Sequence, residues 1–145
     1  MASTPEFRTA DGREVKFVAC EFPGDESFIL AGAQRVARKA GVPIDASALV
    51  SGLHSGRYWG FRILIDGECV GGSVTEIERK RQSGDELLHV WLLWGVRIKE
   101  WLSPGLLAAR QLALDSGCVG VRLGSSRWGW IKLLPKGRLS WVLEL

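Results

Sequence analysis

The sequence predicts a single domain of the α/β class, with helices packed on a mixed sheet, and three observations support this. The chain has 145 residues, about the length of one compact domain, and 46% of them are hydrophobic. Segments with a hydrophobic period of two alternate with segments of helical period. Residues 86–96 form a nearly continuous apolar run, which is typical of a central strand buried on both faces. We therefore expect one core that needs neither a metal nor a disulfide.

The first part of the chain is predicted to contain one strand and two helices. Asp25 is a suitable N-cap and Gly41 a suitable stop for the first helix, and either Asp45 or Ser47 caps the second. The expected elements are a polar lead at residues 1–14, a strand at 15–20, a helix at 25–41 and a helix at 44–52.

The middle of the chain is predicted to form three strands, because the hydrophobic period changes to two at Tyr58. Asp66-Gly67 stands between two alternating runs, which is a strong signal for a hairpin turn. The expected strands are 58–65, 68–78 and 86–96, the last of them central.

The last third is predicted to add two helices and two strands. Pro104 suits the first position of a helix that Ser103 caps and that ends at Gly117. A strand at 118–123, parallel to the central strand, should follow this helix. A two-turn helix at 128–134 and a strand at 139–145 complete the order β-α-α-β-β-β-α-β-α-β.

The hairpin reads Ile65-Asp-Gly-Glu-Cys-Val-Gly-Gly72, and the chain ends with a small polar pair at 125–126, an amphipathic segment at 130–134 and a final strand. Together with the order of the elements, these features resemble the GNAT family, the Gcn5-related N-acetyltransferases. The resemblance implies a single GNAT-like domain at residues 15–145. It also implies acetyl-CoA as cofactor and transfer of its acetyl group to an amine.

The expected cofactor loop departs from the family pattern. In the family, glycines and free N–H groups at a helix N-terminus bind the pyrophosphate of acetyl-CoA. The corresponding residues here are Val96, Arg97, Ser103, Gly105 and Leu106. Pro104 removes one N–H donor, and Glu100 and Trp101 bring an acid and a bulky ring to the same stretch. The sequence therefore predicts an eroded loop, with no cofactor, or with acetyl-CoA if the chain is an enzyme.

Acetyl transfer to an amine needs a base for the amine proton and a proton donor for the departing thiolate. The resemblance points to the central strand for the base, where His89 is the first candidate and Glu86 the second. The chain has no tyrosine after Tyr58, so the donor would be Ser125 or Ser126. Each candidate has a structural alternative: a histidine in an apolar strand is often a satisfied core or edge residue, and serines suit turns and helix caps.

Seven tryptophans are many for this length, and six lie in the second half of the chain. Trp91 and Trp94 are expected on opposite faces of the central strand, because their separation is odd. Tryptophans in loops or at a helix start favour a contact surface. The predicted binding surface consists of Trp101, Arg127, Trp128, Trp130 and Lys132.

The stretch between Asp115 and Glu144 is basic, with no acid among Arg122, Arg127, Lys132, Lys136 and Arg138. Basic residues interleaved with tryptophans suit phosphate groups, so nucleic acid is one predicted partner of this quarter of the chain. The alternative is a solvated face whose long side chains cover apolar surface.

The three cysteines, Cys20, Cys69 and Cys118, are widely spaced and odd in number. The sequence predicts them as small core residues, not as metal ligands or disulfide partners. No apolar run is long enough to span a bilayer, and the first residues do not form an export signal. These observations predict a cytoplasmic protein with no membrane partner.

The eroded loop, the surplus of tryptophan and the basic quarter resemble small GNAT-fold proteins encoded among the structural and assembly genes of tailed bacteriophages. The first hypothesis is therefore a non-catalytic binding or virion-assembly protein that contacts a virion or host protein, in the host cytoplasm or the virion. The alternative is an active acetyl-CoA-dependent N-acetyltransferase. The sequence leaves the oligomeric state open.

Overall fold

The computed structural model describes residues 7–41, 43–79, 82–124 and 140–144, and these form one mixed sheet with helices on both faces. The predicted α/β class with a mixed sheet is confirmed. The described elements are β1 (Phe7–Arg8), β2 (Glu14–Ala19), α1 (Glu26–Ala40), α2 (Ala46–Ser55), β3 (Tyr58–Ile65), β4 (Glu68–Arg79), β5 (Glu86–Gly95), α3 (Ile98–Asp115), β6 (Gly120–Gly124) and β7 (Ser140–Glu144).

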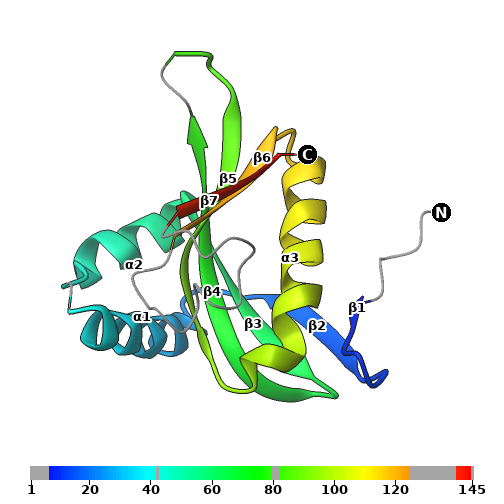
Figure 1. Ribbon diagram of the computed structural model, residues 1–145. Helices are drawn as coiled ribbons and strands as arrows, with labels where there is room; N and C mark the ends of the chain where they lie inside the picture. Colours follow the sequence, from blue (N-terminus) through cyan, green and yellow to red (C-terminus); the bar gives the residue numbers. More distant parts are fainter. Residues whose placement is uncertain (1–6, 42, 80–81, 125–139, 145) are drawn as a thin grey trace.

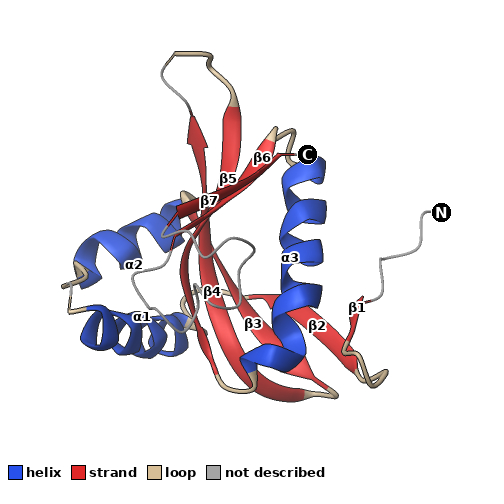
Figure 2. Ribbon diagram, viewed as in Figure 1, coloured by secondary structure: helices blue, strands red, loops and turns tan. Residues whose placement is uncertain are grey.

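The seven strands lie in the sheet in the order in which they occur along the chain. Every neighbouring pair is antiparallel except β5 and β6, which are parallel and are connected through α3. Helices α1 and α2 cover one face of the sheet and α3 covers the other (Figures 1 and 2). As predicted, β5 has a neighbour on each side and packs against both helical layers.

The two helices of the first face begin and end close to where the sequence predicts. The Asp45 carboxylate accepts a hydrogen bond from the backbone N–H of Ala48, 3.1 Å away, and Gly41 ends α1 in the left-handed conformation. Asp25 occupies the N-cap position of α1, but its carboxylate instead accepts from the backbone N–H of Glu21 at 2.8 Å and from Arg62 on β3 at 2.9 Å. Asp25 therefore fastens the start of α1 to the sheet.

Apolar side chains form a core on each face of the sheet. The cluster beneath α1 and α2 consists of Ile29, Ala33, Leu49, Leu53, Val74, Leu92 and Trp94. Two clusters lie beneath α3, one around Val15, Ile63, Ile65, Val70, Trp101 and Leu102, the other around Leu88, Val90, Ala113, Cys118, Val121 and Leu123. Cys118 is buried as predicted, Cys20 is half-buried, and the prediction is wrong for Cys69, which is exposed.

Helix α3 begins at Ile98, so the predicted start at Ser103 and Pro104 is wrong. Trp101 and Leu102 are buried beneath the first turns, and this burial favours the earlier start. Pro104 lies inside the helix, where it has no N–H for the carbonyl of Glu100. The first turn of α3 is inclined to the rest of the helix (Figure 1), as expected near an internal proline.

Trp91 and Trp94 both pack with the core beneath α1 and α2, which corrects the prediction of opposite faces. The register between β4 and β5 shifts between Val74, which pairs with Leu92, and Thr75, which pairs with Val90. Trp91 is therefore the extra residue of a β-bulge, and a bulge reverses the alternation of side chains beyond it.

Two further predictions concern the ends of the chain. The predicted lead includes β1, whose Phe7 pairs with Val15 of β2. The predicted helix at 128–134 lies outside the described residues. None of the described helices is long and apolar enough to cross a membrane.

Candidate functional site

The described parallel pairing of β5 and β6 ends at the bulge. They pair in parallel from Leu87 and Gly120 to Val90 and Leu123, and the pairing stops there. Beyond Trp91, the residues of β5 pair with β4 alone among the described strands. The carboxyl end of this parallel pair is the part of the sheet around which a site is expected.

Aromatic rings from β5 fill the space beneath α1. The Trp94 ring lies 5.8 Å from the Phe28 ring, centroid to centroid, and packs against Gly32 of α1 and Gly72 of β4. Trp91 stacks obliquely on Tyr58, with ring centroids 5.1 Å apart. The second half of β5 is therefore covered on this face by the protein itself.

His89, the predicted base, lies on β5 before the bulge and faces a carboxylate. Its Nδ1 is 3.1 Å from Oε1 of Glu76 on β4, and the two side chains are only 17% and 20% exposed. The Nε of Arg57 is 3.9 Å from the second oxygen of Glu76. A half-buried histidine oriented by a carboxylate has the arrangement of a general base and equally that of a structural ion pair.

Glu76 is a site residue that the sequence prediction missed. Glu76 and Glu78 are two residues apart in a strand with apolar neighbours, so the period of two places both on one face. This alternation was the available signal. The Cα register aligns Tyr58, Glu76, His89 and Arg122 in one row across β3 to β6.

Arg122 is not a free cation, although the sequence prediction included it in a basic surface. Its Nη1 donates to both carboxylate oxygens of Glu78, at 2.7 and 2.9 Å. The two glutamates near this row therefore have basic partners: Arg57 faces Glu76, which also contacts His89, and Arg122 faces Glu78.

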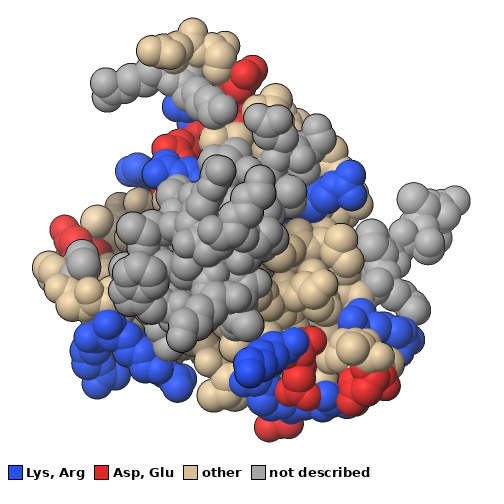
Figure 3. Space-filling view, in the orientation of Figure 1, with Lys and Arg blue, Asp and Glu red and all other residues tan. Residues whose placement is uncertain are grey.

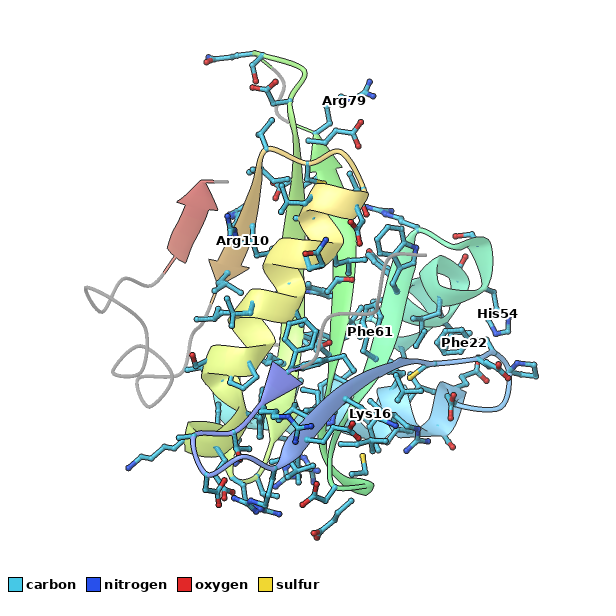
Figure 4. The ribbon with its side chains drawn as sticks, turned by 90° about the vertical axis from the view of Figure 1, so that its right-hand side faces the viewer. Lys16, Phe22, His54, Phe61, Arg79 and Arg110 are labelled. Carbon is cyan, nitrogen blue, oxygen red and sulfur yellow. The ribbon has the colours of Figure 1, made fainter. Side chains whose placement is uncertain are left out.

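Of the three predicted catalytic residues, the structure describes His89 and Glu86, and it does not bring these two together. Glu86 begins β5, opposite Arg79 of β4, with 3.4 Å between its Oε1 and Nη2 of Arg79. Arg79 lies at the far end of the β4–β5 hairpin (Figure 4). Three residues of strand separate Glu86 from His89, roughly 10 Å. Ser125 lies outside the described residues.

Only two residues, Val96 and Arg97, connect β5 to α3. The backbone N–H of Val96 donates to the carbonyl of Val70 at 2.8 Å, and Arg97 has a positive φ of 60° that turns the chain into the helix. Ser103, Gly105 and Leu106, predicted at the cap and first turn of the helix that binds the cofactor, lie further inside α3 instead. The N–H groups at these positions belong to the helical interior, and only the first turn of a helix has unpaired N–H groups.

The carboxylate of Glu100 lies in the first turn of α3 between two guanidinium groups. Arg97 donates to both of its oxygens, and Arg13, from the turn before β2, donates to one of them. These hydrogen bonds, with that of Arg97 the strongest contribution, hold the pKa of Glu100 below its ordinary value. The two arginines near this end of α3 are thus already paired with an acid of the chain.

The charges around the start of α3 balance. Three basic side chains, Arg13, Arg97 and Lys99, lie there with three acidic ones, Asp11, Glu68 and Glu100. Basic and acidic atoms are intermixed in the lower right part of Figure 3. This end of the helix therefore presents no surplus of positive charge to an anion.

Trp101 is a core residue, which corrects its prediction as part of a contact surface. Trp101 is 1% exposed, and its Nε1 donates a hydrogen bond to the carbonyl oxygen of Val96 at 2.7 Å. The other predicted surface residues, Arg127, Trp128, Trp130 and Lys132, lie outside the described residues. Within the described residues, no group of three or more His, Cys, Asp or Glu could hold a metal ion.

Comparison with known proteins gives a fold and no close relative. No family model matches the chain, and no curated protein matches it. A predicted acetyltransferase from Clostridium acetobutylicum, solved with acetyl-CoA, has a TM-score of 0.62 at 11% identity over 90% of this chain and 95% of that one. An aminoglycoside acetyltransferase from an uncultured soil metagenomic sample gives 0.59 at 13% identity, over 83% and 88%. A GNAT family acetyltransferase from Staphylococcus aureus gives 0.54 at 14% identity, over 77% and 86%.

The domain therefore has the GNAT fold, as the order of its elements predicts. At these identities the likeness concerns the fold, and function has to be argued from the residues of the site.

Proposed function

We propose that this chain is a GNAT-fold protein that acts by binding a partner and not by acyl transfer from acetyl-CoA. The observation that carries the proposal is the two-residue connection between β5 and α3, which leaves no loop for a pyrophosphate. A retained scaffold with a changed site is a common way for one fold to serve another function.

The residues present at the start of α3 do not fit the diphosphate of acetyl-CoA. Binding it requires free backbone N–H groups, close backbone approach and positive charge. Ser103 and Gly105 have their N–H groups inside a helix, and Pro104 has none. Glu100 would face the phosphates with a like charge, and the two arginines beside it are already paired with it.

The test is isothermal titration calorimetry of the full chain with acetyl-CoA, CoA and inorganic pyrophosphate as separate titrants. We expect no saturable binding up to about 1 mM of any of them. A dissociation constant for acetyl-CoA in the micromolar range overturns the proposal. In that event the variant Gly105→Asp, which adds a carboxylate to α3, would locate the binding site. The variant should abolish binding at this helix and leave binding elsewhere unchanged.

The partner surface is proposed at Arg127, Trp128, Trp130 and Lys132, since tryptophan and arginine dominate the energetics of protein interfaces. Assembly of a bacteriophage virion is the narrower form of the proposal. This form is tested by mass spectrometry of purified particles of a phage that encodes the chain. Particles of the same phage with the double variant Trp128→Ala/Trp130→Ala are measured alongside. We expect the chain in the particles and the double variant to be depleted from them. Absence of the wild-type chain contradicts the virion role.

A second candidate function, N-acyl transfer, is favoured by one specific observation. His89 and Glu76 form a half-buried pair on the neighbouring strands β5 and β4, next to the last described residue pair of β5 and β6, and such a pair could accept a proton from an amine substrate. This candidate requires that the cofactor be held without the start of α3. It predicts amine-dependent release of CoA, which the binding proposal does not.

A further inference from the structure

Three exposed basic side chains, Arg35, Arg38 and Lys39, lie within five residues near the end of α1. We name them the α1 basic patch. In the part of the chain that the structure describes, none of the three has an ion pair, whereas Arg13, Arg57, Arg62, Arg79, Arg97 and Arg122 each face an acid. Three of the five described cations without an ion pair therefore gather on α1, and the other two, Lys99 and Arg110, lie apart on α3.

Stabilisation of the helix accounts for only part of this patch. Cations in the last turn of a helix interact favourably with its dipole, and Arg38 and Lys39 are in that turn. Arg35 lies before it. The one acid of α1, Glu26, is at the opposite end of the helix, 2.9 Å from His54. No acid of α1 reduces the positive potential at the patch.

The spacing of the patch brings its charges together. Arg35 is three residues from Arg38 and four from Lys39, so the three side chains share one side of the helix, with about 5–6 Å between neighbouring Cβ atoms. Basic atoms gather over α1 at the lower left of Figure 3, with no acidic atoms directly beside them.

The chemistry of the surrounding surface favours nucleic acid over a protein or a membrane. Apart from the patch, the exposed residues of α1 are Ser27, Ala31 and Gln34. A protein interface needs an apolar or aromatic centre, and membrane association of a helix needs a large apolar face. Neither is exposed on α1. Contacts to a phosphate backbone, in contrast, come from Lys and Arg and need no apolar centre.

We propose that the α1 basic patch binds the phosphate backbone of nucleic acid without reading its sequence. The site differs from the basic quarter at the end of the chain and from the surface proposed at residues 127–132. It is independent of whether acetyl-CoA binds, so the two proposals fail separately.

The experiment measures binding of the full chain to a fluorescent DNA duplex of random sequence by anisotropy, in a series from about 50 to 200 mM salt. The test variant is Arg35→Gln/Lys39→Gln. The matched control is Lys99→Gln/Arg110→Gln on α3, which removes the same two residue types, both exposed and without an ion pair in the described residues. Arg110 projects from α3 (Figure 4). Glutamine preserves helix propensity, and circular dichroism verifies the fold.

We expect the test variant to bind the duplex at least tenfold more weakly at low salt, and the slope of log K against log salt to fall by about 2, since each phosphate contact contributes about 0.9. The control should stay within about twofold of the wild type. Three outcomes overturn the proposal. They are equal weakening in the test and control variants, loss of binding only in Lys132→Gln/Arg138→Gln, and no binding of the wild type to the duplex. Binding to anionic vesicles in preference to DNA also overturns it.

Discussion

Arg97 donates hydrogen bonds to both carboxylate oxygens of Glu100, which follows it by three residues in the first turn of α3. The same carboxylate also accepts from Arg13 of the β1–β2 turn, so Glu100 connects the edge of the sheet to the helix. An acid near a helix N-terminus is further stabilised by the helix dipole. The start of α3 thus contains an internal ion-pair network.

The first prediction concerns the pH dependence of this network. The pKa of Glu100 is lowered by its bonds to Arg97 and Arg13. A carboxylate whose pKa is lower in the folded than in the unfolded state stabilises the fold above its unfolded pKa, and this contribution is lost as pH falls through the folded pKa. Glu100→Gln should therefore be less stable than the wild type at pH 7, and the difference should shrink below about pH 5.

Urea unfolding of both proteins across this pH range measures the difference. Glu68→Gln is the matched control, because Glu68 is 74% exposed and lies 3.5 Å from Arg97, and an exposed pair contributes little. A difference between wild type and Glu100→Gln that is constant from pH 7 to pH 3 contradicts the role given to the network.

A second prediction follows from the burial of Trp101. Trp101→Ala should lower the free energy of unfolding by about 3–5 kcal/mol, the usual cost of removing a buried tryptophan. Trp101→Phe retains much of the ring and loses the hydrogen bond to the carbonyl of Val96, so it should cost less, about 1–3 kcal/mol. Urea unfolding measures both. A loss below about 0.5 kcal/mol for the alanine variant would be typical of a surface site and would contradict the core position.

The start of α3 shows how far local sequence signals reach. Proline at the first position of a helix is a strong local preference, and it led to a predicted start at Ser103 and Pro104. The apolar residues Ile98, Trp101 and Leu102 already have helical spacing, but their burial depends on contacts with β2, β3 and β4. Tertiary packing therefore determined where the helix begins, and local sequence preferences contain no information about that packing.

The strands and the first two helices were predictable because each has a periodic apolar face between clear turns. The bulge at Trp91 was not, because alternation in one strand contains no information about the register of its neighbour. His89 was identifiable from its strand, whereas its partner Glu76 required the pairing of β4 with β5. The sequence therefore predicted which type of residue would act at the site, but only part of how the site residues are arranged.

A third prediction tests the close packing of α1 on the sheet at Gly32. A Cβ atom at Gly32 would lie 2.0 Å from Cε2 of Trp94, so the buried ring or the helix must move. Overpacking of a core typically costs about 1–3 kcal/mol, and the gain in helix propensity on replacing glycine by alanine offsets about 1 kcal/mol. We expect Gly32→Ala to be destabilised by about 2 kcal/mol or more in urea unfolding, because this contact is far below normal separation.

The cause of that loss is tested by reducing the ring. Gly32→Ala/Trp94→Phe should be more stable than the sum of the two single variants predicts, because the smaller ring leaves space for the methyl group. Gly24→Ala is the control, since its nearest neighbour would be 3.9 Å away, and it should change stability by less than about 0.5 kcal/mol. Additive effects at Gly32 and Trp94 would show that the clash is not the cause.

The final prediction separates the two candidate roles of His89 and Glu76. If the pair is structural, His89→Gln leaves the carboxylate of Glu76, 20% exposed, without its partner on β5, and stability should fall by about 1–3 kcal/mol. Glu76→Gln/His89→Gln should regain part of this loss, because a neutral amide replaces the carboxylate that has lost its partner on β5, with a coupling energy of about 0.5–3 kcal/mol in a double-mutant cycle. CoA release from acetyl-CoA with a panel of amines should not exceed the uncatalysed rate in the wild type or in either variant.

If His89 is instead a general base, the wild type releases CoA, and His89→Gln slows that release by about 10²–10⁴-fold. That result, together with an unchanged free energy of unfolding, would replace the binding proposal with acyl transfer.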